Sequence, residues 1–262
     1  MSSQFDVKGL SVVVMGGTTG LGLSAARRLI ENGARVIVTS RSESNVQAAL
    51  EVLGPNARGF AADATSPEAA ERAVAMAVES FGKLDALYHV AGGSGRSQGD
   101  GPLHEITDHG LRYTLDLNLN SIIFSNRAAV RQFMKQNSGG VILNMASVLG
   151  YSPSPKFFAS HAYAAAKAGI IGFSKSIASY YAPHNIRVNV IAPALVETPM
   201  SQRAVGNDEV MQFIKTKQPL DGGRIGHPAD CDAAALLLLS PDSKFITGQV
   251  LAVDGGWTVS GC

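Results

Sequence analysis

The chain has 262 residues, of which 45% are hydrophobic and 16% are charged, and its formal net charge is +1. This composition excludes an intrinsically disordered chain, which has too little hydrophobicity and too much net charge to form a core. The sequence also has no block of Lys and Arg residues, and without such a basic surface we expect no nucleic-acid partner.

The N-terminal segment, the most apolar segment and the cysteines predict a protein of the cytoplasm that does not enter a membrane. Residues 1–10 lack the basic start, apolar stretch and cleavage site of a signal peptide. The longest strongly apolar run, residues 233–239, is far shorter than the roughly 20 residues that span a bilayer. Cys231 and Cys262 are not spaced as a zinc site or a disulfide framework, which fits a reducing compartment.

Short apolar runs rich in β-branched residues alternate with helix-length amphipathic segments. Continuous apolar runs of this kind are typical of parallel strands that are buried on both faces of a sheet. We therefore predict one α/β domain over residues 1–262, with a doubly wound fold of the Rossmann type in which helices flank a mostly parallel sheet of about seven strands. The runs are residues 11–17, 34–40, 84–93, 139–147, 186–194 and 248–256.

The segments between these runs carry helix signals and two interruptions. One helix is expected to begin near Leu21, and Ser66 followed by Pro67 marks the start of another. Residues 92–101 are rich in glycine, and residues 198–224 have little strand character. Long irregular segments in compact α/β domains are usually loops or lids near a site, so we expect residues 198–224 to form a substrate lid.

A glycine-rich turn follows the first apolar run and leads directly into a helical pattern. Glycines allow the backbone to turn tightly and to approach a pyrophosphate, while the helix N-terminus offers N–H groups to the anion. The turn is therefore the expected phosphate cradle. Its spacing departs from the G-x-G-x-x-G pattern, so by itself it leaves a plain strand-to-helix turn as an alternative. The turn is Gly16-Gly17-Thr18-Thr19-Gly20-Leu21-Gly22.

Further motifs follow the glycine turn in a characteristic order. Asn118 lies in DLNLN, Ser147 lies in NMASVLG, and TGQ and VDGG lie near the C-terminus, at residues 247–249 and 253–256. Tyr163 and Lys167 enclose the motif YAAAK. Together with the glycine turn, this order resembles the classical short-chain dehydrogenase/reductase family over essentially the whole chain. The resemblance implies an oxidoreductase that transfers hydride between NAD or NADP and a carbonyl or secondary alcohol. The alternative is a non-catalytic nucleotide-binding sensor or scaffold of the same fold.

The end of the second apolar run, VIVTSR, bears on the choice of nucleotide. Family members that prefer NAD place Asp at the position that resembles Ser40, and Arg41 follows it in this chain. A hydroxyl and a guanidinium suit the 2′-phosphate of NADP, because the planar guanidinium can bind a phosphate with two hydrogen bonds. We therefore expect NADP rather than NAD. The alternative is that Arg41 is a solvated loop charge.

The resemblance also places residues along the cofactor. It implies that Asp63 lies beside the adenine and that Thr198 binds the carboxamide of the nicotinamide. Pro193-Ala194 resembles the family's Pro-Gly turn, in which alanine fits only where φ is negative or strain is tolerated. The expected cofactor-binding residues are Gly16, Thr18, Thr19, Gly20, Leu21, Gly22, Ser40, Arg41, Asp63, Ala64, Ala91, Gly92, Tyr163, Lys167, Pro193, Ala194, Val196, Thr198 and Met200.

One motif departs from the family pattern. The family usually has Asn-Asn-Ala-Gly where this chain has His89-Val90-Ala91-Gly92. No residue is therefore assigned to the stabilising role of the two asparagines.

Tyr163 and Lys167 are four residues apart in a strong helical pattern, which puts them on one face of a helix. A nearby ammonium lowers the pKa of a tyrosine, so we expect Lys167 to lower the pKa of Tyr163. By resemblance, Tyr163 is the general acid and base, Lys167 also binds the nicotinamide ribose, and Ser147 holds the substrate oxygen. Asn118 would anchor a water relay to Lys167. These four are the expected catalytic residues.

Two segments are expected to shape the substrate pocket. Residues 148–162 contain two prolines and two phenylalanines, which suggest an apolar wall, although an insertion without function explains them equally well. Residues 198–224 contain apolar side chains such as Met200 and Ile214, which fit either a lid over an apolar substrate or a helix packed on its own domain. No cluster of Arg or Lys in these segments requires an anionic substrate. The substrates we expect are a ketone, a 3-oxoacyl thioester or a sugar-like polyol.

The sequence also bears on metal binding, on hydrolase chemistry and on oligomerisation. His104 and His109 are placed in a glycine-flanked loop, and the chain has no HExxH motif, so we expect no metal site. No G-x-S-x-G motif supplies a hydrolase nucleophile. By resemblance the chain forms a homotetramer or a homodimer. Residues 164–178 suit a helix-to-helix interface and equally suit packing on the sheet.

Overall fold

A computed structural model describes residues 5–261 of the chain. Residues 1–4 and Cys262 lie outside the described part, and so do the expectations that fall on them. Within residues 5–261, seven strands form one sheet in the order β3-β2-β1-β4-β5-β6-β7, and all neighbours are parallel. The doubly wound fold is therefore confirmed. The strands are β1 (Ser11–Met15), β2 (Arg35–Ser40), β3 (Ala57–Ala61), β4 (Ala86–His89), β5 (Gly140–Met145), β6 (Ile186–Pro193) and β7 (Val250–Val253).

Six strands lie where apolar runs predict them, and β3 is the exception. Its sequence is Ala-Arg-Gly-Phe-Ala, and only Ala57 and Phe60 are buried in it. β3 lies at the edge of the sheet and pairs only with β2 among the described strands. An edge strand that is partly open to solvent needs no continuous apolar run, so the hydrophobic pattern does not mark it.

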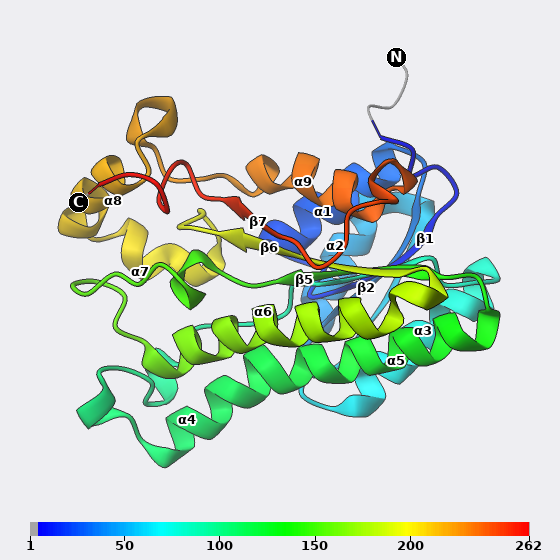
Figure 1. The fold of residues 1–262 in the computed structure, drawn as a ribbon, viewed down its shortest axis with the longest axis horizontal. Coiled ribbons are helices and arrows are strands. Elements are labelled where there is room, and N and C mark those ends of the chain that lie inside the picture. Colours follow the sequence, from blue (N-terminus) through cyan, green and yellow to red (C-terminus); the bar gives the residue numbers. More distant parts are fainter. Residues whose placement is uncertain (1–4, 262) are drawn as a thin grey trace.

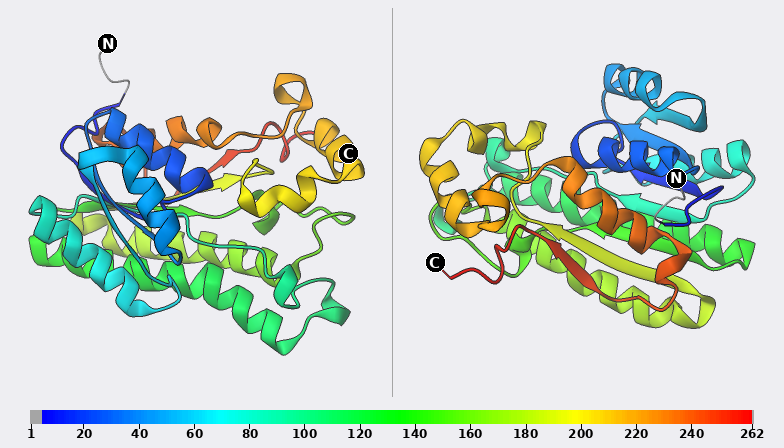
Figure 2. Two further views of the ribbon diagram at one scale, coloured as in Figure 1. Left: turned by 180° about the vertical axis from the view of Figure 1, so that it is seen from behind. Right: turned by 90° about the horizontal axis from the view of Figure 1, so that it is seen from above.

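Helices cover both faces of the sheet. In Figure 1, α1, α2 and α9 lie above the sheet, and α3, α5 and α6 lie below it. The view from behind in Figure 2 shows the same layers. The strand order reverses between β1 and β4, and in open α/β sheets this is where a crevice forms beyond the carboxyl ends of the strands. The helices are α1 (Gly20–Glu31), α2 (Glu43–Leu53), α3 (Pro67–Phe81), α4 (Asp108–Leu115), α5 (Ser121–Gln136), α6 (His161–Tyr181), α7 (Gln202–Val205), α8 (Asp208–Lys217) and α9 (Asp232–Leu239).

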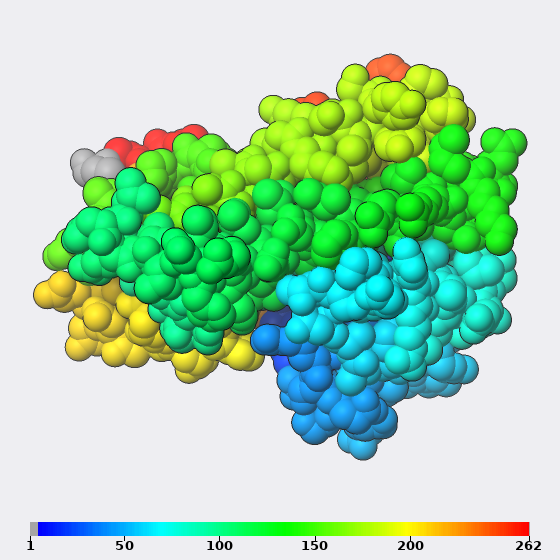
Figure 3. Space-filling view, turned by 90° about the horizontal axis from the view of Figure 1, so that it is seen from below, coloured from blue at the N-terminus to red at the C-terminus, as the bar shows by residue number. Residues whose placement is uncertain are grey.

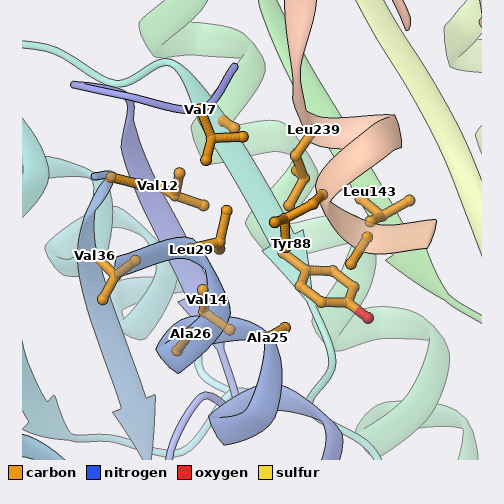
Figure 4. Packing of buried hydrophobic residues seen from close by; sticks show 14 of the residues in the cluster. Val7, Val12, Val14, Ala25, Ala26, Leu29, Val36, Tyr88, Leu143 and Leu239 are labelled. Atoms are coloured by element: carbon orange, nitrogen blue, oxygen red, sulfur yellow. The ribbon is translucent and has the colours of Figure 1, made fainter. Parts of the chain in front are cut away.

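The core has two layers because the side chains of each strand alternate between the faces of the sheet. Val12 and Val14 of β1 pack with Leu29 of α1 on one side, as Figure 4 shows. Val13, between them, packs on the other side in the cluster that contains Phe133 of α5. All five residues of β1 are buried. This two-sided burial explains the continuous apolar runs and holds the strand ends in fixed positions.

Two segments differ in detail from the expectations. Residues 198–224 contain no strand of the sheet, as expected, but they are largely helical rather than irregular, since they contain α7, α8 and short 3₁₀ turns. Their helices are short, so they show little periodicity along the sequence. His109 lies in α4 rather than in a loop, because Thr107 caps that helix by accepting a hydrogen bond from the N–H of Gly110.

The helices and the possible metal ligands of the described residues bear on membranes and metals. None of the helices in residues 5–261 has both the length and the apolar character needed to cross a bilayer. The same residues contain no group of three or more His, Cys, Asp or Glu side chains that could hold a metal ion.

Candidate active site

A cavity of about 680 Å³ opens beyond the carboxyl ends of the strands. It is lined by the segments that follow β1 to β6 and by part of residues 198–224. In Figure 3 the surface is notched between the blue atoms of the first elements and the yellow atoms of this later segment. The expected site residues all line the cavity except Thr18, Gly22 and Asn118, which are buried.

The glycine turn packs closely against its own helix and against the segment after β4. A Cβ atom on Gly22 would lie 2.1 Å from the carbonyl oxygen of Gly16. Gly16 has a φ of 81°, and a Cβ atom there would lie 2.7 Å from the backbone nitrogen of Ala91. Side chains at either position would push these segments apart, so the glycines let the start of α1 face the cavity.

One end of the cavity is formed by the carboxyl ends of β2 and β3. Ser40 and the exposed Arg41 line the cavity there, and no acidic residue stands at the end of β2. Asp63 follows β3, and its Oδ1 accepts hydrogen bonds from the N–H (2.9 Å) and the hydroxyl (2.8 Å) of Thr65. Among the described residues that line the cavity, Asp63 is the only acidic one. This end therefore combines a positive guanidinium with a fixed carboxylate.

Ser147, Tyr163 and Lys167 meet at the middle of the cavity wall. Ser147 follows β5, and the other two lie in the first two turns of α6, on one face as expected. The Nζ atom of Lys167 lies 5.4 Å from the centroid of the Tyr163 ring and donates a hydrogen bond of 3.0 Å to the carbonyl of Met145. The hydroxyl of Ser147 accepts a hydrogen bond from the N–H of Leu149, which fixes its direction.

The pKa values of the pair do not follow the expectation. Burial raises the pKa of Tyr163 to about 12, although a hydrogen bond with Ser147 partly opposes the rise. Burial also lowers the pKa of Lys167 to about 7, since its side chain is almost completely removed from water. The prediction that Lys167 lowers the pKa of Tyr163 is therefore wrong for this arrangement, because desolvation dominates for both groups. Tyr163 is therefore protonated at neutral pH, and Lys167 gives up its proton far more readily than an exposed lysine.

Asn118 ties the α4–α5 junction to the segment after β4. It lies in a single wide π-type turn, Asp116–Asn120, and such turns are frequent at functional sites. Its amide donates to the carbonyls of Gly93 and Thr114, both at 2.9 Å, and its Oδ1 accepts from the N–H of Gly93. A Cβ atom on Gly92 would lie 2.9 Å from this Oδ1 and 3.4 Å from Nζ of Lys167. A residue without a side chain is therefore needed between Asn118 and Lys167.

His89 takes a structural place where the family has an asparagine. Its ring is fully buried, with Nδ1 2.7 Å from the hydroxyl of Ser125 and Nε2 3.1 Å from the carbonyl of Ala91. Burial, followed by the charge of Lys167, lowers the pKa of His89 to about 3. The ring is therefore neutral, and because a carbonyl only accepts, Nε2 carries the hydrogen. This bond fixes the backbone of Ala91 at the cavity wall.

The other end of the cavity is apolar and is closed by the C-terminal segment. Phe158 lines it and makes an edge-on contact with Trp257, with ring centroids 5.8 Å apart. Phe213 of α8 contacts Trp257 from another side, with centroids 5.7 Å apart. The indole N–H of Trp257 donates to the carbonyl of Ser152. Residues 148–162 and 198–224 are thus joined by Trp257, a residue that carried no signal in the sequence.

The residues after β6 keep an unstrained backbone. Ala194 does not have a positive φ, so its replacement of the family's glycine introduces no strain. Thr198 and Met200 both line the cavity, whereas Ile214 lies on the buried face of α8 and packs with Val210 and Trp257. The apolar residues of 198–224 therefore divide between the cavity wall and the packing of the segment on the rest of the chain.

Asp100, in the glycine-rich stretch 92–101, was missed by the sequence reasoning. Its side chain is buried, and its two oxygens accept hydrogen bonds from the N–H groups of Ala162 and Tyr163, each at 3.0 Å. The residue before α6, Ser160, makes no side-chain cap. Asp100 therefore caps α6, and its negative charge lies at the positive end of the helix dipole. It holds the backbone of Tyr163 directly.

Comparisons with known proteins match nearly the whole chain. A family model described as enoyl-(acyl carrier protein) reductase matches residues 16–258. The 3-oxoacyl-[acyl-carrier-protein] reductase FabG of Vibrio cholerae is 36% identical over 96% of this chain and 98% of its own. The 2,5-dichloro-2,5-cyclohexadiene-1,4-diol dehydrogenase of Sphingobium indicum is 31% identical over 97% of this chain and 98% of its own. A solved structure of a short-chain type dehydrogenase/reductase from Mycobacterium ulcerans is 28% identical, with a TM-score of 0.88 over 97% of this chain and 91% of its own.

Replacement of Asp100 by alanine is expected to lower the free energy of unfolding by about 1–3 kcal/mol, because two N–H groups at the start of α6 lose their acceptors. Thermal and denaturant unfolding measure this loss. Amide hydrogen exchange at Ala162 and Tyr163 should become faster, and Asp100→Asn should restore part of the protection. Glu105→Ala, which removes an exposed carboxylate nearby, is the control. Equal stability of Asp100→Ala and the control would refute the capping role.

Proposed function

This chain belongs to the classical short-chain dehydrogenase/reductase family, and we propose that it is an NADP(H)-preferring enzyme that interconverts a carbonyl compound and a secondary alcohol. Oxidoreductase activity is common to the reductase and the dehydrogenase that it resembles. The observation that carries the proposal is the meeting of Ser147, Tyr163 and Lys167 on the wall of one cavity. In this proposal residues 1–262 act as one catalytic domain, with 198–224 as the substrate lid.

The residues around the cavity fit a nicotinamide dinucleotide. The glycine turn brings the N–H groups at the start of α1 to the cavity, where they would hold the pyrophosphate. Asp63 would lie at the adenosine end, and Thr198 with Pro193 at the nicotinamide end. The bound nicotinamide supplies or accepts the hydride. The cavity of about 680 Å³ is within the range of cofactor and ligand sites.

Tyr163 is proposed as the proton donor for carbonyl reduction. With a pKa of about 12, its hydroxyl keeps its proton at neutral pH and can donate it to the oxygen of the substrate. Ser147 would hold the same oxygen. After donation Tyr163 is a phenolate, and the ammonium form of Lys167 would stabilise it. The chain's own residues thus direct the proton, with Tyr163 half-buried at the cavity wall and Lys167 buried behind it.

The preference for NADP rests on Arg41. Its guanidinium is exposed at the cavity edge beside Ser40, without an acidic residue at the end of β2. It makes no hydrogen bond or ion pair with another residue in the described part of the chain, so its donors are available to a 2′-phosphate. An acidic side chain at this position would instead suit a ribose hydroxyl.

We also propose that the chain forms a homotetramer in the cytoplasm. Large apolar side chains are exposed at the end of α6, before β7 and on β7, where family members associate: Tyr180, Phe245 and Leu251. Exposed apolar side chains that cluster over neighbouring elements commonly mark an interface. The free, buried thiol of Cys231 fits a reducing compartment.

Tyr163→Phe is expected to lower the turnover number about 10²- to 10⁴-fold while NADPH binding and the melting temperature stay near those of the wild type. NADPH oxidation is followed against a panel of ketones, 3-oxoacyl thioesters and sugars, and the reverse reaction with NADP⁺ against the matching alcohols. Tyr180→Phe, on the exposed end of the same helix, is the control. Turnover of Tyr163→Phe equal to the control would show that the catalytic assignment is wrong. Binding of NADPH without turnover of any compound by the wild type would favour a sensor.

Arg41→Ala is expected to raise the Kd for NADPH about tenfold or more and to leave the Kd for NADH nearly unchanged, because only NADPH has the 2′-phosphate. Ser40→Asp should reverse the preference through repulsion of that phosphate. Trp257, the single tryptophan, lines the cavity, so quenching of its fluorescence can report binding. Arg27→Ala, an exposed arginine of α1 outside this cavity, is the control. Equal weakening of both nucleotides by Arg41→Ala would contradict the preference.

The pH dependence of reduction follows from Lys167. Its ammonium is charged below a pKa of about 7 and loses its charge above it, so kcat/KM for NADPH should fall as the pH rises through about 7. Lys167→Arg keeps a positive charge and should remove this limb from the profile. Lys175→Arg, an exposed lysine of α6, should retain it. An unchanged limb in Lys167→Arg would assign the ionisation to another group.

A further inference from the structure

Two arginines from distant parts of the chain line the cavity that contains Tyr163. Arg96 comes from the stretch 92–101 that follows β4, and Arg203 lies in α7. Arg203 is next to Ala204, which packs in the same cluster as Phe158 and Trp257. Arg203 is exposed, and both arginines line the part of the cavity that contains Phe158 and Trp257, so this part is not wholly apolar.

The Arg96 side chain is held in place by a backbone acceptor. Its Nη2 atom donates a hydrogen bond of 3.3 Å to the carbonyl of Phe157, and the Phe157 ring makes a tilted contact with Phe213, with centroids 5.3 Å apart. This bond uses one of the five N–H groups of the guanidinium. This bond orients the Arg96 guanidinium, and its remaining N–H groups can donate to a ligand in the cavity.

Within residues 5–261, no carboxylate makes a hydrogen bond or an ion pair with either arginine. Asp100 attracts Arg96 through its charge, while its two oxygens accept hydrogen bonds from the N–H groups of Ala162 and Tyr163. Arg203 has no hydrogen bond or ion pair with any residue of the described part. The pKa of Arg96 is lowered, first by burial and next by the charge of Arg203, which shows that the two positive groups repel each other. An anion between them would remove this repulsion.

Serine hydroxyls and a tyrosine accompany the arginines on the cavity wall. Ser94, Ser97 and Tyr113 line it beside Arg96, and their hydroxyls can donate hydrogen bonds to an oxyanion. Arginine binds carboxylates and phosphates with paired, charge-assisted hydrogen bonds. A positive wall of this kind favours a substrate that has a negative group at some distance from its reacting carbon.

We propose that Arg96 and Arg203 form a subsite for a carboxylate or phosphate group of the substrate, so that the enzyme selects anionic carbonyl compounds. This inference rests on the proposed function. It goes beyond the expectation that no cluster of basic residues in residues 148–162 and 198–224 requires an anionic substrate, because Arg96 lies outside these segments.

The experiment compares charged substrates with uncharged partners of the same length. Acetoacetate, levulinate and 5-oxohexanoate are paired with their methyl esters, and dihydroxyacetone phosphate is paired with dihydroxyacetone. For the best pair, wild-type kcat/KM should be at least tenfold higher for the anion, and the preference should fall as salt is added. The carboxylate and phosphate series show which oxyanion the subsite takes.

Variants assign the preference to the two arginines. Arg96→Gln and Arg203→Gln should each lower kcat/KM for the anion about 10-fold, and the double variant more, while the uncharged partner and the Kd for NADPH change little. Arg112→Gln removes the same charge from an exposed position of α4 outside the cavity and should behave like the wild type. Equal losses for anion and uncharged partner, a wild type without preference, or a raised Kd for NADPH in the variants would each overturn the proposal.

A failure of the proposed function can be distinguished from a failure of the subsite. If the wild type reduces no compound of the panel, titration with glutarate and with inorganic phosphate in the presence of NADP⁺, followed by Trp257 fluorescence, tests the subsite by binding alone. Saturable binding that is weakened about tenfold in Arg96→Gln/Arg203→Gln supports it. Binding that is absent, or equal in wild type and double variant, refutes it.

Discussion

The site depends on the burial of the Lys167 amine. An ammonium group removed from water is costly unless its charge is balanced or its proton is given up, and its hydrogen bond in the described part of the chain goes to the carbonyl of Met145. The surrounding residues keep this cost from rising further. His89 stays neutral beside it, and Gly92 has no side chain that would separate Lys167 from Asn118. The balance leaves Lys167 near its point of half ionisation at neutral pH, where small changes in its surroundings alter its charge.

Much of the fold could be read from the sequence because the relevant patterns are local. The apolar run of β1 follows from its burial on both faces, and the four-residue spacing of Tyr163 and Lys167 follows from the helix repeat. The glycine turn was identified for the same reason, since Gly16 and Gly22 are close in both sequence and space. β3 shows the limit of this reasoning. An edge strand with an exposed arginine has no continuous apolar run, and only its pairing with β2 defines it.

Properties that depend on distant contacts could not be read in this way. The cap of α6 comes from Asp100, 63 residues before Tyr163, and its stretch of sequence shows only glycines and polar residues. His89 finds its partner Ser125 on another element, so the sequence showed the loss of an asparagine without showing what replaces it. The predicted direction of the Tyr163 pKa shift is wrong for a related reason. A nearby ammonium is visible in the sequence, whereas the extent of burial is a property of the folded chain.

The stretch 92–101 links the catalytic helix to the charge of the cavity through a single carboxylate. Asp100 accepts hydrogen bonds from the N–H groups of Ala162 and Tyr163, which would otherwise be costly to leave without acceptors, and it attracts Arg96 through its charge alone. The helix therefore keeps the carboxylate, and the guanidinium keeps an unpaired positive charge at the cavity wall. A residue that positions Tyr163 thus also leaves Arg96 available to an anion. The position of this one carboxylate thus bears both on the start of the catalytic helix and on the charge balance around Arg96.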